Sequence, residues 1–120
     1  MNLTYSTNYT ENGILIVNLS GRILSKDDSE DIAEELTQNI DKGNIYVIMN
    51  LAELEYINST GLNFIISSFT KMRNAGGELV ISSVSQKVQD LLVITKLNTI
   101  FTSFDTLQEA KDSFSKQILN

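Results

Sequence analysis

Two hydroxyl side chains and a glycine follow one another in the stretch Asn58-Ser59-Thr60-Gly61-Leu62. The stretch lies between an apolar segment expected to be a strand, Tyr46 to Leu51, and an apolar segment expected to be a helix. The first backbone N–H groups of a helix lack intrahelical acceptors, and the positive end of the helix dipole lies there, so a phosphate is stabilised at that position. This arrangement predicts that Ser59 accepts a phosphoryl group and acts as a switch.

Each residue of this stretch also has a purely structural interpretation. Ser59 can serve only as a helix cap, and Thr60 is either a second phosphate acceptor or a structural hydroxyl. Asn58 is typical of an N-cap or a turn, and it can also contact a partner directly. Gly61 has no side chain and would let the backbone of a kinase or partner approach Ser59, whereas Leu62 is expected to anchor the helix.

The composition limits the classes of function open to this chain. Its 120 residues suit one compact domain, 42% of them are hydrophobic, and the net charge is −6. The acidic excess disfavours nucleic acid and anionic membranes as partners. Cysteine and histidine are absent, which excludes disulfides and Cys-based zinc sites and removes the commonest general base. No segment approaches the roughly 20 apolar residues of a membrane helix, and no signal-peptide pattern opens the chain, so we expect a cytoplasmic location.

The first part of the chain is predicted to form a hairpin. Leu3 to Tyr9 alternates weakly, and Ile14 to Leu19 is rich in β-branched residues, so both are expected to be strands. The turn between them is predicted at Glu11-Asn12-Gly13, because Asn-Gly between apolar runs favours a tight hairpin. Gly21 is expected to close the second strand.

The segment after the hairpin is predicted to be an amphipathic helix. Asp27 and Glu30 have the spacing of a capping box, and apolar residues then recur every four positions up to Ile40, so we expect the helix to end near Gly43. The acidic cluster Asp27-Asp28-Ser29-Glu30-Asp31 lacks the glycine and the alternating ligands of a calcium loop. It is therefore interpreted as a solvated helix start, and no metal site is expected.

The rest of the chain alternates between predicted strands and helices. Tyr46 to Leu51 shows little alternation, which is typical of a strand buried on both faces in the centre of a sheet. The following helix is expected to open at Asn58 or Ser59, to run to about Asn74, and to be stopped by Gly76-Gly77. The remaining predictions are a strand at Leu79 to Ile81, a short helix capped by Ser85, a short strand at Ile100-Phe101, and a last helix with Asp105 and Gln108 as its capping pair.

This order of elements defines the fold class. Strands that alternate with helices require a largely parallel sheet with right-handed crossovers, to which the first hairpin adds an antiparallel strand. We therefore predict an α/β fold with a mixed, largely parallel sheet of about five strands and about four α-helices. In such sheets the functional loops lie beyond the carboxyl ends of the strands, and the loop at Asn58 to Leu62 belongs to that edge.

Two segments match a known signature. Leu19-Ser20-Gly21-Arg22-Ile23-Leu24 is similar to a strand-to-loop segment usually written Gly-Arg-Leu-Asp. Ile57-Asn58-Ser59-Thr60-Gly61-Leu62 is similar to an Asp-Ser-Ser/Thr-Gly-Leu signature before the second helix. By these motifs, its length and its element order, the chain resembles the STAS domains, and among them the stand-alone bacterial anti-sigma-factor antagonists. The resemblance covers nearly the whole chain and implies a single STAS domain over residues 1–120.

The resemblance implies a function for the serine of the signature. In that family the first serine is phosphorylated by a partner kinase that is also an anti-sigma factor, and the motif assigns this role to Ser59. The unmodified domain binds the partner and frees the sigma factor, and the phosphorylated domain does not bind. The implied partner-binding residues are Arg22, Asn58, Ser59, Thr60 and Gly61, although Arg22 can equally be a solvated charge beside a turn.

Two positions depart from the family pattern. Asn58 stands where the family usually has an aspartate, and Ser25 stands where an aspartate often follows the Gly-Arg-Leu segment. A carboxylate beside the acceptor hydroxyl can orient or repel groups during phosphoryl transfer, and here it is missing.

Three classes of function remain open from the sequence. The leading one is a phosphorylatable binding module that competes for an anti-sigma kinase, with no cofactor. The alternative is a STAS adaptor or scaffold that never accepts phosphate, in a stressosome-like assembly or as the soluble subunit of a lipid-transport complex. An enzyme ranks last, because the chain has no P-loop, no Gly-x-Gly-x-x-Gly and no nucleophile elbow. The sequence leaves the oligomeric state open.

Overall fold

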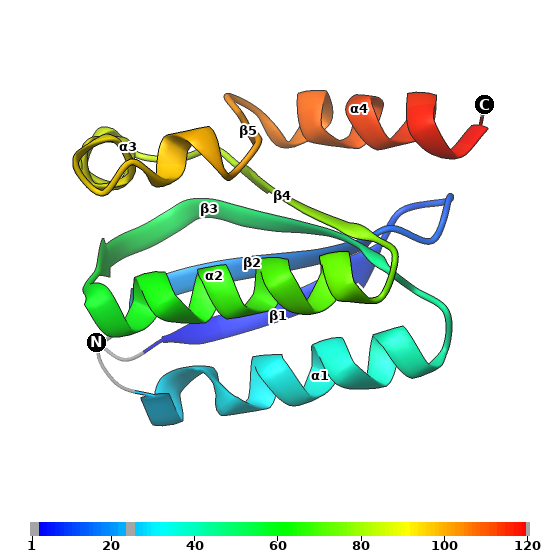
Figure 1. The fold of residues 1–120 in the computed structure, drawn as a ribbon, viewed down its shortest axis with the longest axis horizontal. Helices are drawn as coiled ribbons and strands as arrows, with labels where there is room; N and C mark the ends of the chain where they lie inside the picture. The colour runs from blue at the N-terminus through cyan, green and yellow to red at the C-terminus, as the bar shows by residue number, and fades with distance from the viewer. Residues whose placement is uncertain (1–2, 24–25, 120) are drawn as a thin grey trace.

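A single five-stranded sheet organises the computed structural model, which describes residues 3–23 and 26–119 (Figure 1). The strand order is β1-β2-β3-β4-β5, with β1 antiparallel to β2 and every other neighbouring pair parallel. This confirms the predicted mixed, largely parallel sheet. The strands are β1 (Thr4–Tyr9), β2 (Leu15–Ile23), β3 (Tyr46–Ile57), β4 (Glu78–Ser82) and β5 (Ser103–Phe104).

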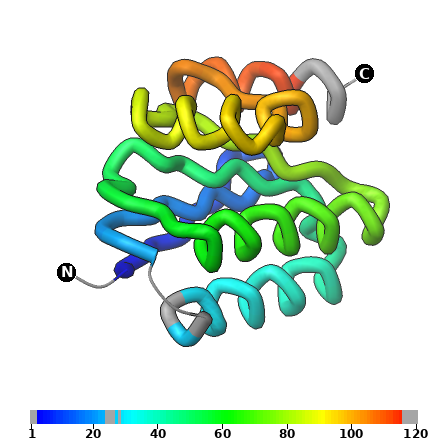
Figure 2. The backbone as a smooth tube through the Cα atoms, turned by 60° about the vertical axis from the view of Figure 1, so that its left-hand side comes forward, coloured from blue at the N-terminus to red at the C-terminus, as the bar shows by residue number. Residues whose placement is uncertain are grey.

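The helices cover both faces of the sheet. α1 and α2 lie against one face and α4 lies against the other, as the two views of the backbone show (Figures 1 and 2). α3 contacts β3 and the short 3-10 turn that follows it, and its buried Val88 and Leu92 belong to the same apolar cluster as α1 and α2. The α-helices of the described residues are α1 (Glu30–Asp41), α2 (Ser59–Asn74), α3 (Gln86–Ile94) and α4 (Leu107–Leu119), and the 3-10 turns are η1 (Lys26–Ser29) and η2 (Leu97–Thr99).

The predicted central strand is confirmed as the middle strand of the sheet. In β3, Val47 and Met49 belong to the larger apolar cluster beneath α1 and α2, whereas Ile48 packs in a smaller cluster with Phe114 of α4. All three β3 side chains are completely buried. A strand covered on both faces needs no polar side, which explains the apolar run from Tyr46 to Met49.

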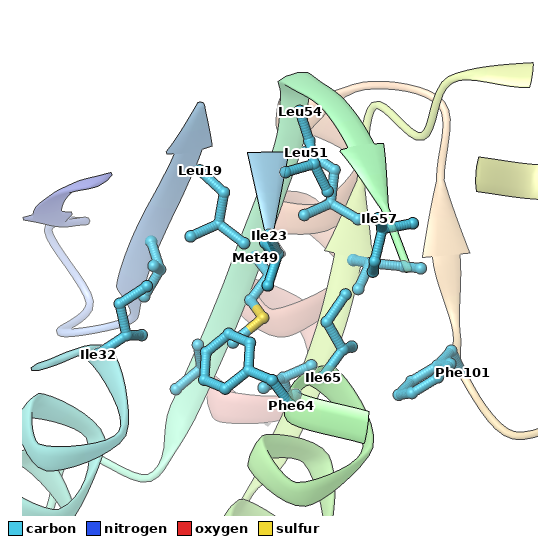
Figure 3. Packing of buried hydrophobic residues seen from close by; sticks show 14 of the residues in the cluster. Leu19, Ile23, Ile32, Met49, Leu51, Leu54, Ile57, Phe64, Ile65 and Phe101 are labelled. Carbon is cyan, nitrogen blue, oxygen red and sulfur yellow. The ribbon is translucent and has the colours of Figure 1, made fainter. Parts of the chain in front are cut away.

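The larger cluster ties the carboxyl-end half of the sheet to α2. Figure 3 shows Phe64 and Ile65 of α2 lying around Met49 of β3 and Ile23 of β2. The ring of Phe101 packs on Phe69 in an edge-to-face arrangement with the ring centroids 5.3 Å apart. Apolar contacts therefore hold α2 against β2 and β3.

Several predicted element ends are confirmed. α2 runs from Ser59 to Asn74 as expected, and α1 ends at Asp41, just before Gly43. In the hairpin turn Gly13 has a φ of +82° and donates a hydrogen bond of 3.0 Å to the carbonyl of Thr10. Ser85 caps α3 by accepting a hydrogen bond of 3.3 Å from the backbone N–H of Val88.

The prediction that Gly21 closes the second strand is wrong. β2 continues to Ile23, and Gly21 lies within it at a φ of +93°, next to a register shift in the pairing with β3. A bulge of this kind lets a strand continue past a glycine with positive φ. The extended pairing also carries β3 beyond its predicted end at Leu51, as far as Ile57.

The predicted start of the first helix is also wrong. Asp27 lies in the 3-10 turn η1, and the N-cap of α1 is Ser29. The capping-box spacing therefore marked the turn that leads into the helix. Ser25 lies outside the described residues, so its departure from the family pattern has no structural account.

Two predictions near the carboxyl end are displaced by a few residues. The short strand is not Ile100-Phe101, because Phe101 buries its ring in the core and the chain pairs with β4 only afterwards, at β5. The capping pair of α4 is not Asp105 and Gln108. Thr106 accepts a hydrogen bond of 3.1 Å from the backbone N–H of Glu109 and donates one of 3.1 Å to its carboxylate.

Candidate functional site

Ser59 lies where the sequence placed it, exposed at the first position of α2. β3 ends at Ile57, which pairs with Ile23 at the end of β2, so Ser59 stands at the carboxyl edge of two neighbouring parallel strands. A residue at this edge belongs to the region where α/β sheets place their functional loops. The hydroxyl is therefore available to another molecule.

Asn58 is the N-cap of α2. Its side-chain oxygen accepts a hydrogen bond of 3.0 Å from the backbone N–H of Gly61, and its carbonyl accepts one of 2.9 Å from Leu62. The backbone N–H groups of Ser59 and Thr60 precede the first intrahelical bond and have no acceptor within the helix. The first turn of α2 also contains no acidic residue. The local field at Ser59 thus favours an added negative charge.

Gly61 is buried against the ends of two strands. A Cβ atom on this residue would lie 2.7 Å from Cγ1 of Ile57 and 2.9 Å from Cβ of Ile23, closer than real side-chain contacts allow. The missing side chain faces the core, so this glycine lets α2 pack closely on β2 and β3, and it does not open a path for a partner's backbone as the sequence suggested. Leu62 is buried beside it and anchors the helix as predicted.

The two hydroxyls of the loop have different surroundings. Thr60 is half-buried and lines a hollow of about 480 Å³ between the starts of α1 and α2. Ser59 is exposed and does not line this hollow. Ser59 is therefore the more accessible of the two hydroxyl residues. The hollow is lined by Ser29, Glu30, Ala33, Thr60, Asn63, Phe64 and Ser67.

Arg22 lies near the end of β2, exposed, and its guanidinium stands over the ring of Tyr56, 5.0 Å from the ring centroid. The two residues are register partners in the parallel pairing of β2 with β3. Arg22 and Tyr56 line a second hollow, of about 420 Å³, together with Glu55 of β3 and Lys87 of α3. The sequence analysis missed Tyr56 and Lys87, because only long-range pairing brings them to Arg22.

The described residues 3–23 and 26–119 contain no group of three or more carboxylates placed to hold a metal ion. In the same part of the chain, no helix combines the length and apolar character needed to cross a bilayer. The arrangement at the site is thus an exposed hydroxyl on a helix start, near a hollow lined by Arg22, Glu55, Tyr56 and Lys87. Such a site can accept a modification and contact a protein.

Residues 5–110 match the family model of the STAS domain. Among related sequences, a Bordetella bronchiseptica protein named "Putative anti-sigma factor antagonist BtrV" is 29% identical over 102 residues, covering 85% of this chain and 87% of the relative. The anti-sigma F factor antagonist of Paenibacillus polymyxa is 28% identical over 94 residues, covering 78% of this chain and 80% of the relative.

The fold is similar to that of a solved protein known in two states. The Bacillus cell fate determinant SpoIIAA in its phosphorylated form superposes with a TM-score of 0.73 at 17% identity, covering 92% of this chain and 99% of the other. The structure of SpoIIAA in its unphosphorylated form gives a TM-score of 0.72 at 17% identity, covering 92% of this chain and 97% of the other. At this level of identity the likeness concerns the fold.

Proposed function

Since the chain belongs to the STAS domain family, we propose that it is an anti-sigma-factor antagonist that is switched off by phosphorylation of Ser59. The observation that carries the proposal is the exposed hydroxyl of Ser59 at the first position of α2, within the family's signature. The names of the Bordetella and Paenibacillus relatives support the antagonist role. The existence of a phosphorylated form of SpoIIAA supports a phosphate switch on this fold.

The proposed partner is an anti-sigma factor that is also a serine kinase, and the proposed location is the cytoplasm. The partner would pack over Ser59 and contact Asn58, Thr60 and Arg22, which lie around it at the carboxyl edge of β2 and β3. Gly61 contributes by fixing the position of the helix start. The chain acts in this scheme as a binding module and as a substrate of the kinase.

The energetics of the switch follow from the position of Ser59. Phosphorylation adds a charge of about −1.5 to −2 and three acceptor oxygens. Within the domain the helix dipole stabilises this charge by about 0.3–1 kcal/mol, so the fold is kept. In the complex the partner protein removes water from the phosphate and supplies no opposite charge. This costs about 2–5 kcal/mol and lowers the affinity by at least about 30-fold. Binding is therefore lost while folding is not.

The direct test is phosphorylation with purified components. The chain is incubated with Mg-ATP and the anti-sigma kinase of the same organism, and intact mass and site mapping identify the modified residue. We expect one phosphate, on Ser59, in the wild type and in Thr60→Ala, and none in Ser59→Ala. Ser59→Ala should bind the kinase and remain bound when ATP is added.

The adaptor alternative predicts a different result. A chain that carries no phosphate after incubation, together with tight kinase binding by Ser59→Glu, would contradict the switch and favour a scaffold role. A melting temperature of Ser59→Glu close to that of the wild type is the required control. It shows that any lost binding comes from the surface and not from unfolding.

A further inference from the structure

The two edges of the sheet differ in length. β5 closes one edge with only two residues, Ser103 and Phe104, whereas β1 forms the other edge with six, Thr4–Tyr9 (Figure 1). β1 contains no charged residue and no proline, and it pairs with β2 without a register shift. Natural proteins usually avoid long, regular and uncharged edges, because such edges pair with further strands. The β1 edge is therefore suited to binding an extended segment.

The pairing of β1 with β2 shows which backbone groups face outward. The backbone N–H of Thr10 donates a hydrogen bond of 3.0 Å to the carbonyl of Ile14, and this pair continues the register of the two strands. Hydrogen-bonded pairs alternate along an antiparallel ladder, so the even-numbered residues of β1 bond to β2. The N–H and C=O groups of Tyr5, Thr7 and Tyr9 therefore point away from β2. Among the described residues, no strand lies on that side.

The side of α1 next to this edge is acidic. A hollow of about 280 Å³ is lined by Tyr5 of β1 and by Asp31, Glu34, Glu35 and Gln38 of α1. Burial, the negative charge and hydrogen bond of Glu35, and the negative charges of Asp31 and Glu34 raise the pKa of Tyr5. The three carboxylates thus act on the edge strand itself. No lysine or arginine is among the described residues that line the hollow.

Two lysines of the described chain lie near α1, and neither lines this hollow. Lys71 of α2 donates hydrogen bonds of 3.3 Å to the carbonyl of Ala33 and 2.8 Å to the hydroxyl of Thr37, on the side of α1 that faces α2. Lys42 follows the end of α1. Within the described part of the chain, the carboxylates are also not grouped to hold a metal ion. The acidic side of α1 is thus open to cationic side chains of another molecule.

The residues of β1 and α1 that touch one another have matching periods. Thr7 donates a hydrogen bond of 3.1 Å from its hydroxyl to Oε1 of Glu35, and the Tyr9 hydroxyl donates one of 2.6 Å to Oδ1 of Asn39. Two residues of β1 therefore correspond to four residues of α1, which is about 6.8 Å along the strand and about 6 Å along the helix. A strand added beside β1 has the same period, so basic side chains at every second position would meet successive turns of α1.

We propose that the outer side of β1, together with Asp31, Glu34 and Glu35 of α1, binds an extended segment of another protein that carries basic side chains at alternate positions. This surface is here called the β1 docking edge. The segment adds a sixth strand to the sheet, and hydrogen bonds to the outward backbone groups of β1 supply affinity. The three carboxylates select the lysine or arginine side chains. The inference goes beyond the proposed function and does not depend on it.

The acidic side chains argue against other occupants of the β1 docking edge. Two copies of the chain that paired their β1 strands about a twofold axis would have both α1 helices on the same face of the joined sheet. The carboxylates of Asp31, Glu34 and Glu35 from both copies would then lie close together, and like charges in such positions repel. The same carboxylates repel the phosphate backbone of a nucleic acid.

The first test measures amide hydrogen exchange in ¹⁵N-labelled chain with a synthetic seven-residue peptide. Threonine and lysine alternate in the peptide, with lysine at the second, fourth and sixth positions. With saturating peptide, the N–H groups of Tyr5, Thr7 and Tyr9 should exchange at least about tenfold more slowly. Those of Ser6 and Asn8 already bond to β2 and should change little. Unchanged exchange at the three odd-numbered residues would overturn the β1 docking edge.

Two methylated peptides test whether the backbone makes the contact. One peptide carries N-methyl groups on its lysine amides, and the other carries them on its inner threonine amides. Only one of these two sets of amides faces β1 in an added strand, so one peptide should lose binding and the other should bind. Equal affinity of the two methylated peptides would overturn strand addition.

A charge-neutralising variant tests the acidic side of α1. Asp31→Asn/Glu34→Gln should weaken binding of the unmethylated peptide about fivefold at low salt and flatten its salt dependence. The matched control is Asp90→Asn/Asp112→Asn, which removes two exposed carboxylates from α3 and α4 and should bind like the wild type. Unchanged affinity of the first variant, or an equal loss in both, would overturn the role of the carboxylates.

The other occupants give distinct results. Dimers in analytical ultracentrifugation, with slow exchange at Tyr5, Thr7 and Tyr9 before peptide is added, would assign the edge to a second copy and overturn the proposal. Equally tight binding of a peptide with glutamate in place of lysine would overturn the selection of basic side chains. Ser59→Glu should bind the lysine peptide like the wild type, so failure of Ser59 phosphorylation would contradict the proposed function and leave the β1 docking edge standing.

Discussion

Replacing Gly61 by alanine should destabilise the protein through the contact that positions Ser59. The new Cβ atom would lie 2.7 Å from Cγ1 of Ile57 and 2.9 Å from Cβ and Cγ2 of Ile23, roughly 1 Å inside an ordinary carbon contact. Overpacking of this kind costs about 1–3 kcal/mol. Alanine recovers about 0.5–1 kcal/mol through its better helix propensity. With the middle value of each range, the expected net loss is about 1 kcal/mol in the free energy of unfolding.

Urea unfolding followed by circular dichroism measures this loss in the free energy of unfolding. In a separate thermal unfolding experiment, the melting temperature should fall by about 2–8 °C for a domain of this size. Thr70→Ala is the matched control, because Thr70 is exposed on the same helix and its replacement adds no atom to the core. It should stay within about 0.5 kcal/mol of the wild type. A Gly61→Ala variant as stable as the wild type would refute the claim that close packing requires this glycine.

Substitutions at three further positions test the cap of α2, the close contact of the chain after α2 with the backbone of Ile45, and a titrating tyrosine. Asn58→Ala should lose about 1 kcal/mol of stability by urea unfolding, whereas Asn58→Asp should keep the cap and stay within about 0.5 kcal/mol of the wild type. Gly77→Ala should destabilise more than Gly61→Ala in the same assay, because its Cβ would collide with the backbone carbonyl of Ile45. Burial, and the negative charge of Glu35 with its hydrogen bond, raise the pKa of Tyr5 above its usual 10.0. The folded state therefore keeps a proton that the unfolded state releases above that pH, so the urea midpoint should fall as pH rises past 10 and fall less in Tyr5→Phe.

The elements that the sequence predicted well are those whose signal is local. The apolar run that opens β3 and the Asn-Ser-Thr-Gly helix start each depend on residues that are neighbours in the chain. The hydroxyl of Ser85 likewise caps the helix that follows it directly. Periodicity and capping chemistry therefore sufficed to order the elements and to place Ser59 at the start of α2.

The features that the sequence did not predict depend on pairing between distant segments. The residues next to Gly21 in the sequence predict that the strand ends there, but the pairing of β2 with β3 continues through Gly21 to Ile23. The burial of Gly61 likewise follows from contact with the ends of both strands. Arg22, Tyr56 and Lys87 come from three separate elements, and no spacing along the chain indicates that they meet.

On the proposed function, a phosphate on Ser59 would control binding without a change of fold. A modification shifts an equilibrium only by the difference between its free energies in the two states. In the free domain the added charge at Ser59 faces solvent and a helix start, and the anchoring contacts of Asn58 and Gly61 point away from it into the helix and the core. In the proposed complex the partner would enclose the same charge. In this proposal the free-energy difference arises in the bound state, so switching requires no movement of α2, and structures of the chain with and without phosphate should superpose.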